Sequence, residues 1–236
     1  MPEILELNKK YGKFTALDSL SMNITENSIF GFVGPNGAGK TTTMKIMAGL
    51  LKADSGGIYI NGEDILKNPK SIRDKIGYMP DFFGVYDDLK VSEYMDFYAG
   101  TYYIPYAERG TLIDNLLEVV DLTDKKDTYV DSLSRGMKQR LCLARSLIHD
   151  PELIILDEPA SGLDPRARVE MKEILKELRE MGKTIIVSSH ILPELAEMCS
   201  EIGIIDHGKL VTQGTVNEIM NRINKKRLVK VKLSNG

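Results

Sequence analysis

Residues 34–42, GPNGAGKTT, offer a binding site for phosphate. They fit the pattern GxxxxGK(S/T), the phosphate-binding loop or P-loop. Glycines let backbone N–H groups turn inward around phosphate oxygens, and the start of a following helix adds a partial positive charge. The residues expected to bind a nucleotide here are Gly34, Asn36, Gly37, Gly39, Lys40, Thr41 and Thr42.

Three side chains at the end of the P-loop carry separate parts of the chemistry. Lys40 can reach the β- and γ-phosphates, Thr41 offers a hydroxyl to Mg²⁺, and Thr42 can contact the α-phosphate. A chance glycine-rich turn is the alternative. The apolar, β-rich run 29–33 before the loop and the helical spacing of apolar residues over 41–51 favour a nucleotide site.

Two adjacent acids, Asp157 and Glu158, offer the second half of such a site. They follow the apolar run 153–156, which is typical of a buried parallel strand. We expect this strand to lie next to that of residues 29–33, so that Asp157 holds Mg²⁺ directly or through water. Glu158 is then placed to orient or deprotonate an attacking water. Adjacent acids alone would favour a capping or solvated turn; together with the P-loop they favour catalysis.

The elements around these motifs predict an α/β fold. An antiparallel β layer is predicted by three features of the first 62 residues. Apolar and polar residues alternate weakly near the N-terminus, a short strand covers 58–60, and the Asn-Gly pair at 61–62 is typical of a hairpin turn. Buried strands over 153–156 and 184–187 and a hairpin around 207–208 predict the rest of the sheet. We therefore expect a P-loop NTPase core with a mostly parallel sheet, beside an N-terminal antiparallel β layer.

A helix is expected to begin after Asp164, which can cap it and precedes a proline. Gly182 is placed as its C-terminal stop. Residues 215–218 form a capping box for a short helix further on. The predicted apolar side of the helix after Asp164 consists of Val169, Ile174, Leu175 and Leu178.

Residues 81–150 differ in character from the rest of the chain. Nine of the 16 aromatic residues lie between 82 and 106. Apolar residues then recur at helical spacing over 113–120 and 137–148. We predict a mainly helical subdomain inserted in the α/β core. Its rings can form the core of the subdomain, or a few can form an apolar docking patch for a partner.

The composition narrows the possible partners and surroundings. The chain has 236 residues and a net charge of −3, so we expect no binding of nucleic acid through charge. Cys142 and Cys199 lie in apolar helical patterns. We expect both to be buried, reduced thiols of a cytosolic protein. No apolar run reaches the length that spans a bilayer, so work at a membrane would need a partner. Apolar and polar residues alternate again over 229–233, which predicts a strand. Residues 215–236 are therefore expected to be the start of a C-terminal extension, complete or truncated.

The chain resembles the ATP-binding-cassette family over nearly its whole length, up to about residue 214. The P-loop and residues 153–158 resemble the Walker A and Walker B motifs of that family, and LSRGMKQR at 133–140 resembles its signature. Residues 161–164 resemble its D-loop. His190 and Tyr11 are similar to its switch histidine and to its adenine-stacking aromatic. The sequences of residues 133–140 and 188–211 are similar to those of ATP-binding subunits of bacterial export-type transporters.

The resemblance implies an ATPase subunit that binds ATP and Mg²⁺ and drives a membrane-spanning permease. It implies a cytoplasmic location, peripheral on the inner face of the cell membrane through the permease, without insertion in the bilayer. It implies a head-to-tail pair with a second copy or a related ATP-binding subunit. In such a pair Ser134 and Gly136 of one copy would meet the γ-phosphate held by the other. The resemblance makes Glu158, His190 and Lys40 catalytic. From the residues alone, Ser134 is equally an ordinary helix N-cap and His190 a structural histidine.

Two residues depart from the family pattern. Asp81 stands where the family usually has a glutamine that contacts Mg²⁺ or the attacking water, so it keeps an oxygen ligand but adds a charge. Repulsion by Glu158 leads us to expect Asp81 away from the P-loop in nucleotide-free protein. Arg135 replaces a signature glycine, and either points outward or approaches the phosphates.

Two other functions stay open at this point. A non-transport member of the family, acting on nucleic acid or ribosomes, would usually carry coiled-coil insertions, zinc sites or tandem cassettes, and the sequence shows none of them. A non-hydrolysing nucleotide sensor would result if Asp81 and Arg135 abolish turnover.

Overall fold

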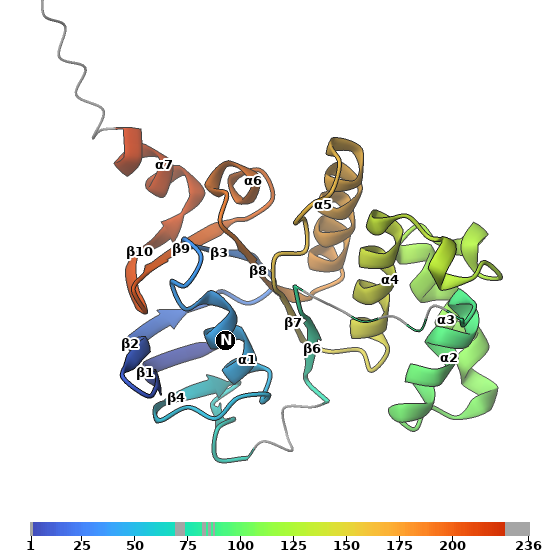
Figure 1. Cartoon of the computed structure of the whole chain (residues 1–236), viewed down its shortest axis with the longest axis horizontal. Coiled ribbons are helices and arrows are strands. Elements are labelled where there is room, and N and C mark those ends of the chain that lie inside the picture. The colour runs from blue at the N-terminus through green and yellow to red at the C-terminus, as the bar shows by residue number, and fades with distance from the viewer. Residues whose placement is uncertain (1, 69–73, 82–83, 85, 87, 225–236) are drawn as a thin grey trace, which may run out of the picture.

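Two β-sheets and a set of helices make up the computed structural model, which describes residues 2–68, 74–81, 84, 86 and 88–224 (Figure 1). The expected strand over 229–233 lies outside these residues, as do Phe82 and Phe83 of the aromatic stretch. Whether residues 81–150 form a separate subdomain, and whether 215–236 begin an extension, stay predictions.

The first sheet is the predicted antiparallel layer. Its four strands have the order β2-β1-β4-β5. Asn61 and Gly62 join β4 to β5 with φ angles of 52° and 80°, the left-handed pair that a tight hairpin turn requires. The bounds are β1 (Glu3–Tyr11), β2 (Phe14–Asn23), β4 (Ser55–Ile60) and β5 (Glu63–Asp64).

The second sheet is mostly parallel, as predicted. Its six strands have the order β10-β9-β3-β8-β7-β6, and only the hairpin of β9 and β10 is antiparallel. β3, β7 and β8 are buried along their whole length, which explains their continuous apolar runs. The bounds are β3 (Ile29–Val33), β6 (Ile76–Met79), β7 (Leu153–Leu156), β8 (Thr184–Ser189), β9 (Glu201–Asp206) and β10 (Lys209–Thr215).

The expected neighbour relation between the two site-bearing strands is wrong. β8 lies between β3 and β7 and pairs with both in parallel register, so Asp157 is one strand further from the P-loop than expected. β6 was not predicted at all. It is only four residues long and contains Gly77, where an added Cβ would lie 2.4 Å from the carbonyl oxygen of Ser146 on the packed helix.

The helices are distributed unevenly around the sheets. In Figure 1, α2 and α3 stand at one end of the molecule, while α4 and α5 lie between them and the sheets. The helices predicted over 113–120 and 137–148 are confirmed as parts of α3 and α4. The bounds are α1 (Lys40–Met47), α2 (Val91–Thr101), α3 (Tyr106–Val119), α4 (Arg135–Leu147), α5 (Pro165–Glu180), α6 (Leu192–Ala196) and α7 (Val216–Asn224), with short 3₁₀ helices η1 (Thr123–Lys125) and η2 (Val130–Ser132).

The predicted ends of α5 are confirmed, but its predicted apolar side is partly wrong. Oδ1 of Asp164 accepts a hydrogen bond from the N–H of Ala167 at 2.9 Å, and Gly182 follows the helix with φ 88°. Val169 is 59% exposed and Met171 is buried in its place. The reason is phase, because residues 171, 174, 175 and 178 form one helical stripe and residue 169 falls outside it.

Two hydrophobic cores hold the layers together. One lies around α1 between the two sheets, and the other lies between the central sheet and the remaining helices. Cys142 and Cys199 pack in or against the second core as free cysteines. Burial raises the pKa of Cys142 to about 11 and that of Cys199 to about 12, so both stay protonated near neutral pH. None of the described helices has the length and apolar character to cross a bilayer.

Candidate nucleotide site

A cleft of about 300 Å³ lies where the chain leaves β3, β7 and β8. Ligands of α/β proteins bind at this edge of the sheet, outside the carboxyl ends of the strands. Most of the predicted site residues meet in this cleft. They are Tyr11, Asn36, Gly37, Gly39, Lys40, Thr41, Thr42, Asp81, Glu158 and His190.

The shape of the P-loop depends on two glycines that closely approach other backbone. A Cβ at Gly34 would lie 2.4 Å from the carbonyl oxygen of Ile205, and one at Gly39 would lie 2.8 Å from that of Ala16. Gly39 also has a φ of 112°, a conformation that side chains rarely adopt. These positions exclude larger residues, so the path of the loop requires glycine at both.

Lys40 is buried at the floor of the cleft, with only 6% of its side chain exposed. Its Nζ donates to the carbonyl oxygens of Gly34 at 2.6 Å and Pro35 at 3.3 Å, and lies 3.5 Å from Oε1 of Glu158. A positive charge so placed is available to phosphate oxygens, which are stronger partners than carbonyl groups.

Asp157 is almost fully buried, and within the described part of the chain only one of its two carboxylate oxygens is hydrogen-bonded. Its Oδ1 accepts from the hydroxyl of Ser188 at 2.7 Å, and this hydroxyl also accepts from the N–H of Glu158 at 2.9 Å. Among the described residues, the buried Oδ2 of Asp157 has no hydrogen-bond partner. A buried carboxylate oxygen without a partner is costly, and it is the kind of ligand that Mg²⁺ prefers.

Ser188 is a part of the site that sequence reasoning missed. It lies on β8, and its hydroxyl connects Asp157 to the strand that separates it from the P-loop strand. The available signal was a hydroxyl residue at the end of a buried strand, just before His190. Phe14, which lines the cleft near Tyr11, was also missed.

Glu158 is held between two basic side chains. One carboxylate oxygen faces Lys40, and the other lies 3.0 Å from Nδ1 of His190, whose N–H can donate to it. The backbone of Glu158 has a φ of 52°, in the left-handed region that non-glycine residues rarely adopt. Such strain persists only where the surroundings fix it, and it occurs often at active sites.

Asp81 lines the same cleft as the P-loop, so the expectation that it lies away from that loop is wrong for this structure. Partial desolvation raises the pKa of its carboxyl group, and the charges of Asp157 and Glu158 raise it further. Arg135 opposes this shift. Its guanidinium lies over the D-loop, where a Cβ at Gly162 would be 2.6 Å from Cζ.

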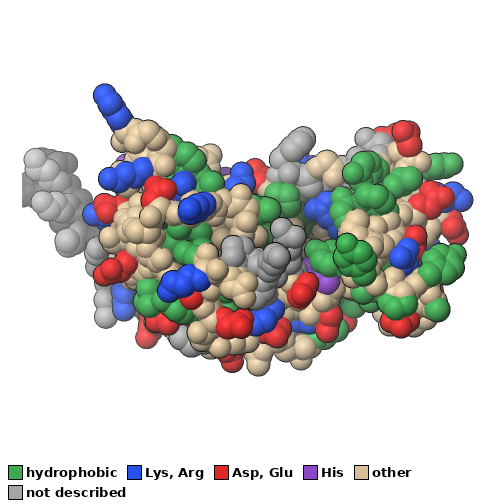
Figure 2. Space-filling model, turned by 90° about the horizontal axis from the view of Figure 1, so that it is seen from below, with side chains coloured by type: hydrophobic (Ala, Val, Ile, Leu, Met, Phe, Trp, Pro, Cys, Tyr) green, Lys and Arg blue, Asp and Glu red, His purple; other side chains and the backbone are tan. Residues whose placement is uncertain are grey.

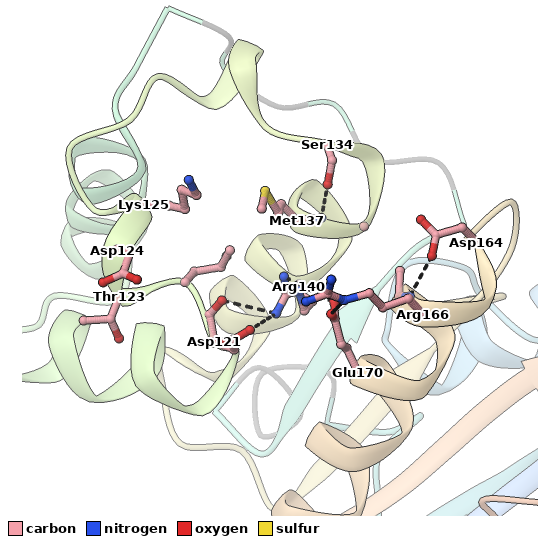
Figure 3. Close-up of a pocket in the computed structure, with 13 residues that line it drawn as sticks. Asp121, Thr123, Asp124, Lys125, Ser134, Met137, Arg140, Asp164, Arg166 and Glu170 are labelled. Carbon is pink, nitrogen blue, oxygen red and sulfur yellow. Dashed lines mark hydrogen bonds and ion pairs between the residues drawn. The ribbon is translucent and has the colours of Figure 1, made fainter.

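Ser134 and Gly136 lie in a different cleft, of about 430 Å³, between α4, α5 and η1 (Figure 3). Ser134 caps α4, because its hydroxyl accepts from the N–H of Met137 at 3.3 Å. Gly136 allows α4 to pack closely on α5, since an added Cβ would lie 3.0 Å from that of Ala167. Within one chain, these residues and the P-loop belong to separate sites.

The fold and the cleft define a P-loop ATPase. The chain belongs to the ABC transporter family, whose model matches residues 17–161. The bacitracin transport ATP-binding protein BcrA of Bacillus licheniformis is 41% identical over 221 residues, which are 93% of this chain and 71% of that protein. The linearmycin resistance ATP-binding protein LnrL of Bacillus subtilis strain 168 is 35% identical over 228 residues, which are 97% of this chain and 73% of that protein.

A solved structure shows the same fold. The dimeric structure of MJ0796, a bacterial ABC transporter cassette, has a TM-score of 0.82 and 26% identity, and the match covers 92% of this chain and 99% of that one. The chain is therefore an ATP-binding subunit of an ABC transporter, an ATPase coupled to transport. The comparisons give no support to the non-transport alternative.

Proposed function

We propose that two copies of this chain pair head to tail, hydrolyse ATP at two shared sites, and so drive a membrane-spanning permease in the direction of export. The separation of the two clefts carries this proposal: Lys40 lines one, and Ser134 lines the other. A two-fold pair would place Ser134 and Gly136 of each copy against the nucleotide held by the P-loop of its partner. The dimeric structure of the related cassette MJ0796 supports pairing of two copies.

The described side chains divide the binding of ATP among them. Backbone N–H groups of the P-loop and Nζ of Lys40 would bind the β- and γ-phosphates, Thr42 the α-phosphate, and the half-exposed ring of Tyr11 the adenine. Mg²⁺ would be held by Thr41 and Asp157, with Asp81 within reach, and would neutralise phosphate charge.

Hydrolysis would follow from the placement of Glu158. Its carboxylate would accept a proton from water as the water oxygen attacks the γ-phosphorus and the bond to the ADP oxygen breaks. His190 orients this carboxylate through Nδ1, and Lys40 stabilises the negative charge on the transferred phosphoryl group.

The export direction and the location rest on relatives. BcrA is named for bacitracin transport and LnrL for linearmycin resistance, which fits removal of compounds from the cell. We place this subunit on the cytoplasmic face of the cell membrane, held there by the permease and not inserted in the bilayer.

Phosphate release by the purified chain tests the function. With Mg-ATP it should hydrolyse ATP, and the rate should rise when its permease is present in a bilayer. Folded protein that binds ATP but releases no phosphate under either condition would favour the nucleotide sensor instead.

The aromatic stretch supplies both buried core residues and exposed surface residues, and docking of a partner on the exposed rings stays a prediction. Tyr94 is fully buried, whereas Phe97 is 48% and Tyr106 is 83% exposed. Phe97 and Tyr106 line a groove of about 730 Å³ between α2 and α3. Figure 2 shows hydrophobic side chains gathered over this end of the molecule. We propose that an apolar segment of the permease docks here.

Replacing Phe97 and Tyr106 together with serine should uncouple transport while basal ATP hydrolysis and the melting temperature stay close to wild type. The rings are exposed and are not among the buried core residues, so their loss should cost little packing beyond the edge contacts of Phe97 with Tyr86 and Tyr98. Tyr94→Ser is the matched control, and it should lower the melting temperature because it empties a buried site. Normal transport by the stable double variant would refute docking at this groove.

Replacing Asp81 with glutamine should raise the Mg²⁺ concentration that gives half-maximal ATP hydrolysis, by roughly 2- to 10-fold. A neutral amide oxygen binds a hard cation less well than a carboxylate. The measurement is the ATPase rate across a Mg²⁺ titration, with Asp127→Asn as a control at an exposed acid outside the cleft. The same Mg²⁺ dependence in wild type and Asp81→Gln would mean that Asp81 never reaches the metal.

A further inference from the structure

Two ion pairs join α5 to the segment of α6 and its C-cap residue Glu197, and these two helices follow the D-loop and His190. Nη1 of Arg168 lies 2.9 Å from Oε1 of Glu194, and Nζ of Lys172 lies 3.2 Å from Oε2 of Glu197. The side chains are 43% exposed in Arg168 and 19% in Glu194, against 22% in Lys172 and 71% in Glu197. Glu194 is thus the more enclosed of the two acids, and an enclosed charge is more sensitive to the loss of its partner than an exposed one.

Hydrogen bonds connect Glu194 to Ser189 and Ile191, the residues on either side of His190. The other oxygen of Glu194, Oε2, accepts from the hydroxyl of Ser189 at 3.5 Å. That hydroxyl in turn accepts from the N–H of Ile191 at 3.0 Å. The residues before and after His190 are thus connected to Glu194, and through it to Arg168 on α5.

His190 itself has little else to fix its position. Its side chain is 47% exposed, and within the part of the chain that the structure describes it makes one hydrogen bond, to Glu158. The direction of the imidazole therefore depends on the backbone at residues 189–191. That backbone is held at Ser189 by the pairing of β8 with β3, and after Ser189 by the contacts of the Ser189 hydroxyl with Ile191 and Glu194.

We propose that Arg168 and Glu194 form a positioning pair that holds His190 against Glu158 and connects it to the helix that follows the D-loop. This inference rests on the proposed roles of His190 and Glu158. Neither Arg168 nor Glu194 lines the nucleotide cleft, so the pair acts on turnover and not on ATP binding. Loss of the pair should lower kcat and leave KM nearly unchanged.

Charge reversal tests the pair. Arg168→Glu and Glu194→Arg should each lower kcat roughly 10- to 100-fold, since a misplacement of about 1 Å can lower the rate by about 10²-fold. The double variant Arg168→Glu/Glu194→Arg restores the opposite charges and should recover most of kcat. The double reversal Lys172→Glu/Glu197→Lys, and each of its single changes, should keep kcat within about twofold of wild type because the acid of that pair, Glu197, is 71% exposed.

Melting temperatures show whether each variant is folded, and one neutral variant separates loss of the ion pair from loss of the fold. If a reversed variant fails to fold, Glu194→Gln decides, because it keeps the shape and removes the charge; it should fold, lower kcat and leave KM unchanged. Single reversals with wild-type kcat, no recovery in a folded double variant, or an equal loss from the Lys172 and Glu197 changes would overturn the proposal. Absence of phosphate release by the wild-type chain would instead overturn the proposed function, and normal turnover by Glu158→Gln would overturn the role of Glu158, so these failures are distinguishable from failure of the pair.

Discussion

Glu158→Gln is expected to lower ATP turnover by about 10²- to 10⁴-fold while ATP binding persists, because proton transfer by a positioned carboxylate contributes about that much. A glutamine amide has nearly the same shape but cannot take a proton from water. It can still accept the hydrogen bond from Nδ1 of His190, so the cleft should keep its form. Phosphate release and a fluorescent-nucleotide titration, measured on the same preparation, separate turnover from binding.

Glu177→Gln is the matched control for this variant. Glu177 is exposed on α5 and does not line the cleft, so its loss should leave turnover unchanged. Wild-type turnover by Glu158→Gln would show that another group takes the proton. The assignment of Glu158 would then be wrong.

Lys40→Ala is expected to weaken nucleotide binding by roughly 10- to 100-fold, because hydrogen bonds to charged groups contribute about 1.5–3 kcal/mol. The ammonium group lies at the floor of the cleft and faces the P-loop carbonyl groups and Glu158. Its removal also leaves Glu158 without one of its two basic neighbours, so turnover should fall with binding. Isothermal titration with ATP measures the effect, and circular dichroism shows whether the chain is folded.

Lys45→Ala provides the comparison for the lysine. Lys45 lies on the same helix, α1, but is exposed and outside the cleft, so its loss removes an equal charge without touching the site. A folded Lys40→Ala that binds ATP as tightly as Lys45→Ala would contradict the site.

The parts of the site that were predictable depend on neighbours in sequence. The P-loop brings its glycines, Lys40 and Thr41 together within nine residues, so a strand before it and a helix after it are enough to place them. Asp164 is similar, because an N-cap acts on an N–H three residues away. Such features can be predicted from the sequence because they depend only on residues close together in the chain.

The parts that were not predictable depend on packing between distant segments. No local signal places β8 between β3 and β7, because strand order is decided by long-range pairing. Repulsion by Glu158 argued that Asp81 lies away from the P-loop, but the fold places Asp81 in the cleft, with Arg135 opposing the rise in its pKa. The contact of Arg168 with Glu194 joins residues 26 positions apart and depends on how α5 meets α6.

The central claim is that ATP is held between two copies of this chain, and the molar mass of Glu158→Gln in solution tests it most directly. Light scattering after size exclusion should give one chain without nucleotide and two chains with Mg-ATP, since ATP connects the copies and the variant cannot remove it by hydrolysis. Adding Ser134→Arg should block the pair while the P-loop still binds ATP. Glu158→Gln that stays a single chain with ATP bound, or pairing that persists with Ser134→Arg, would contradict the account.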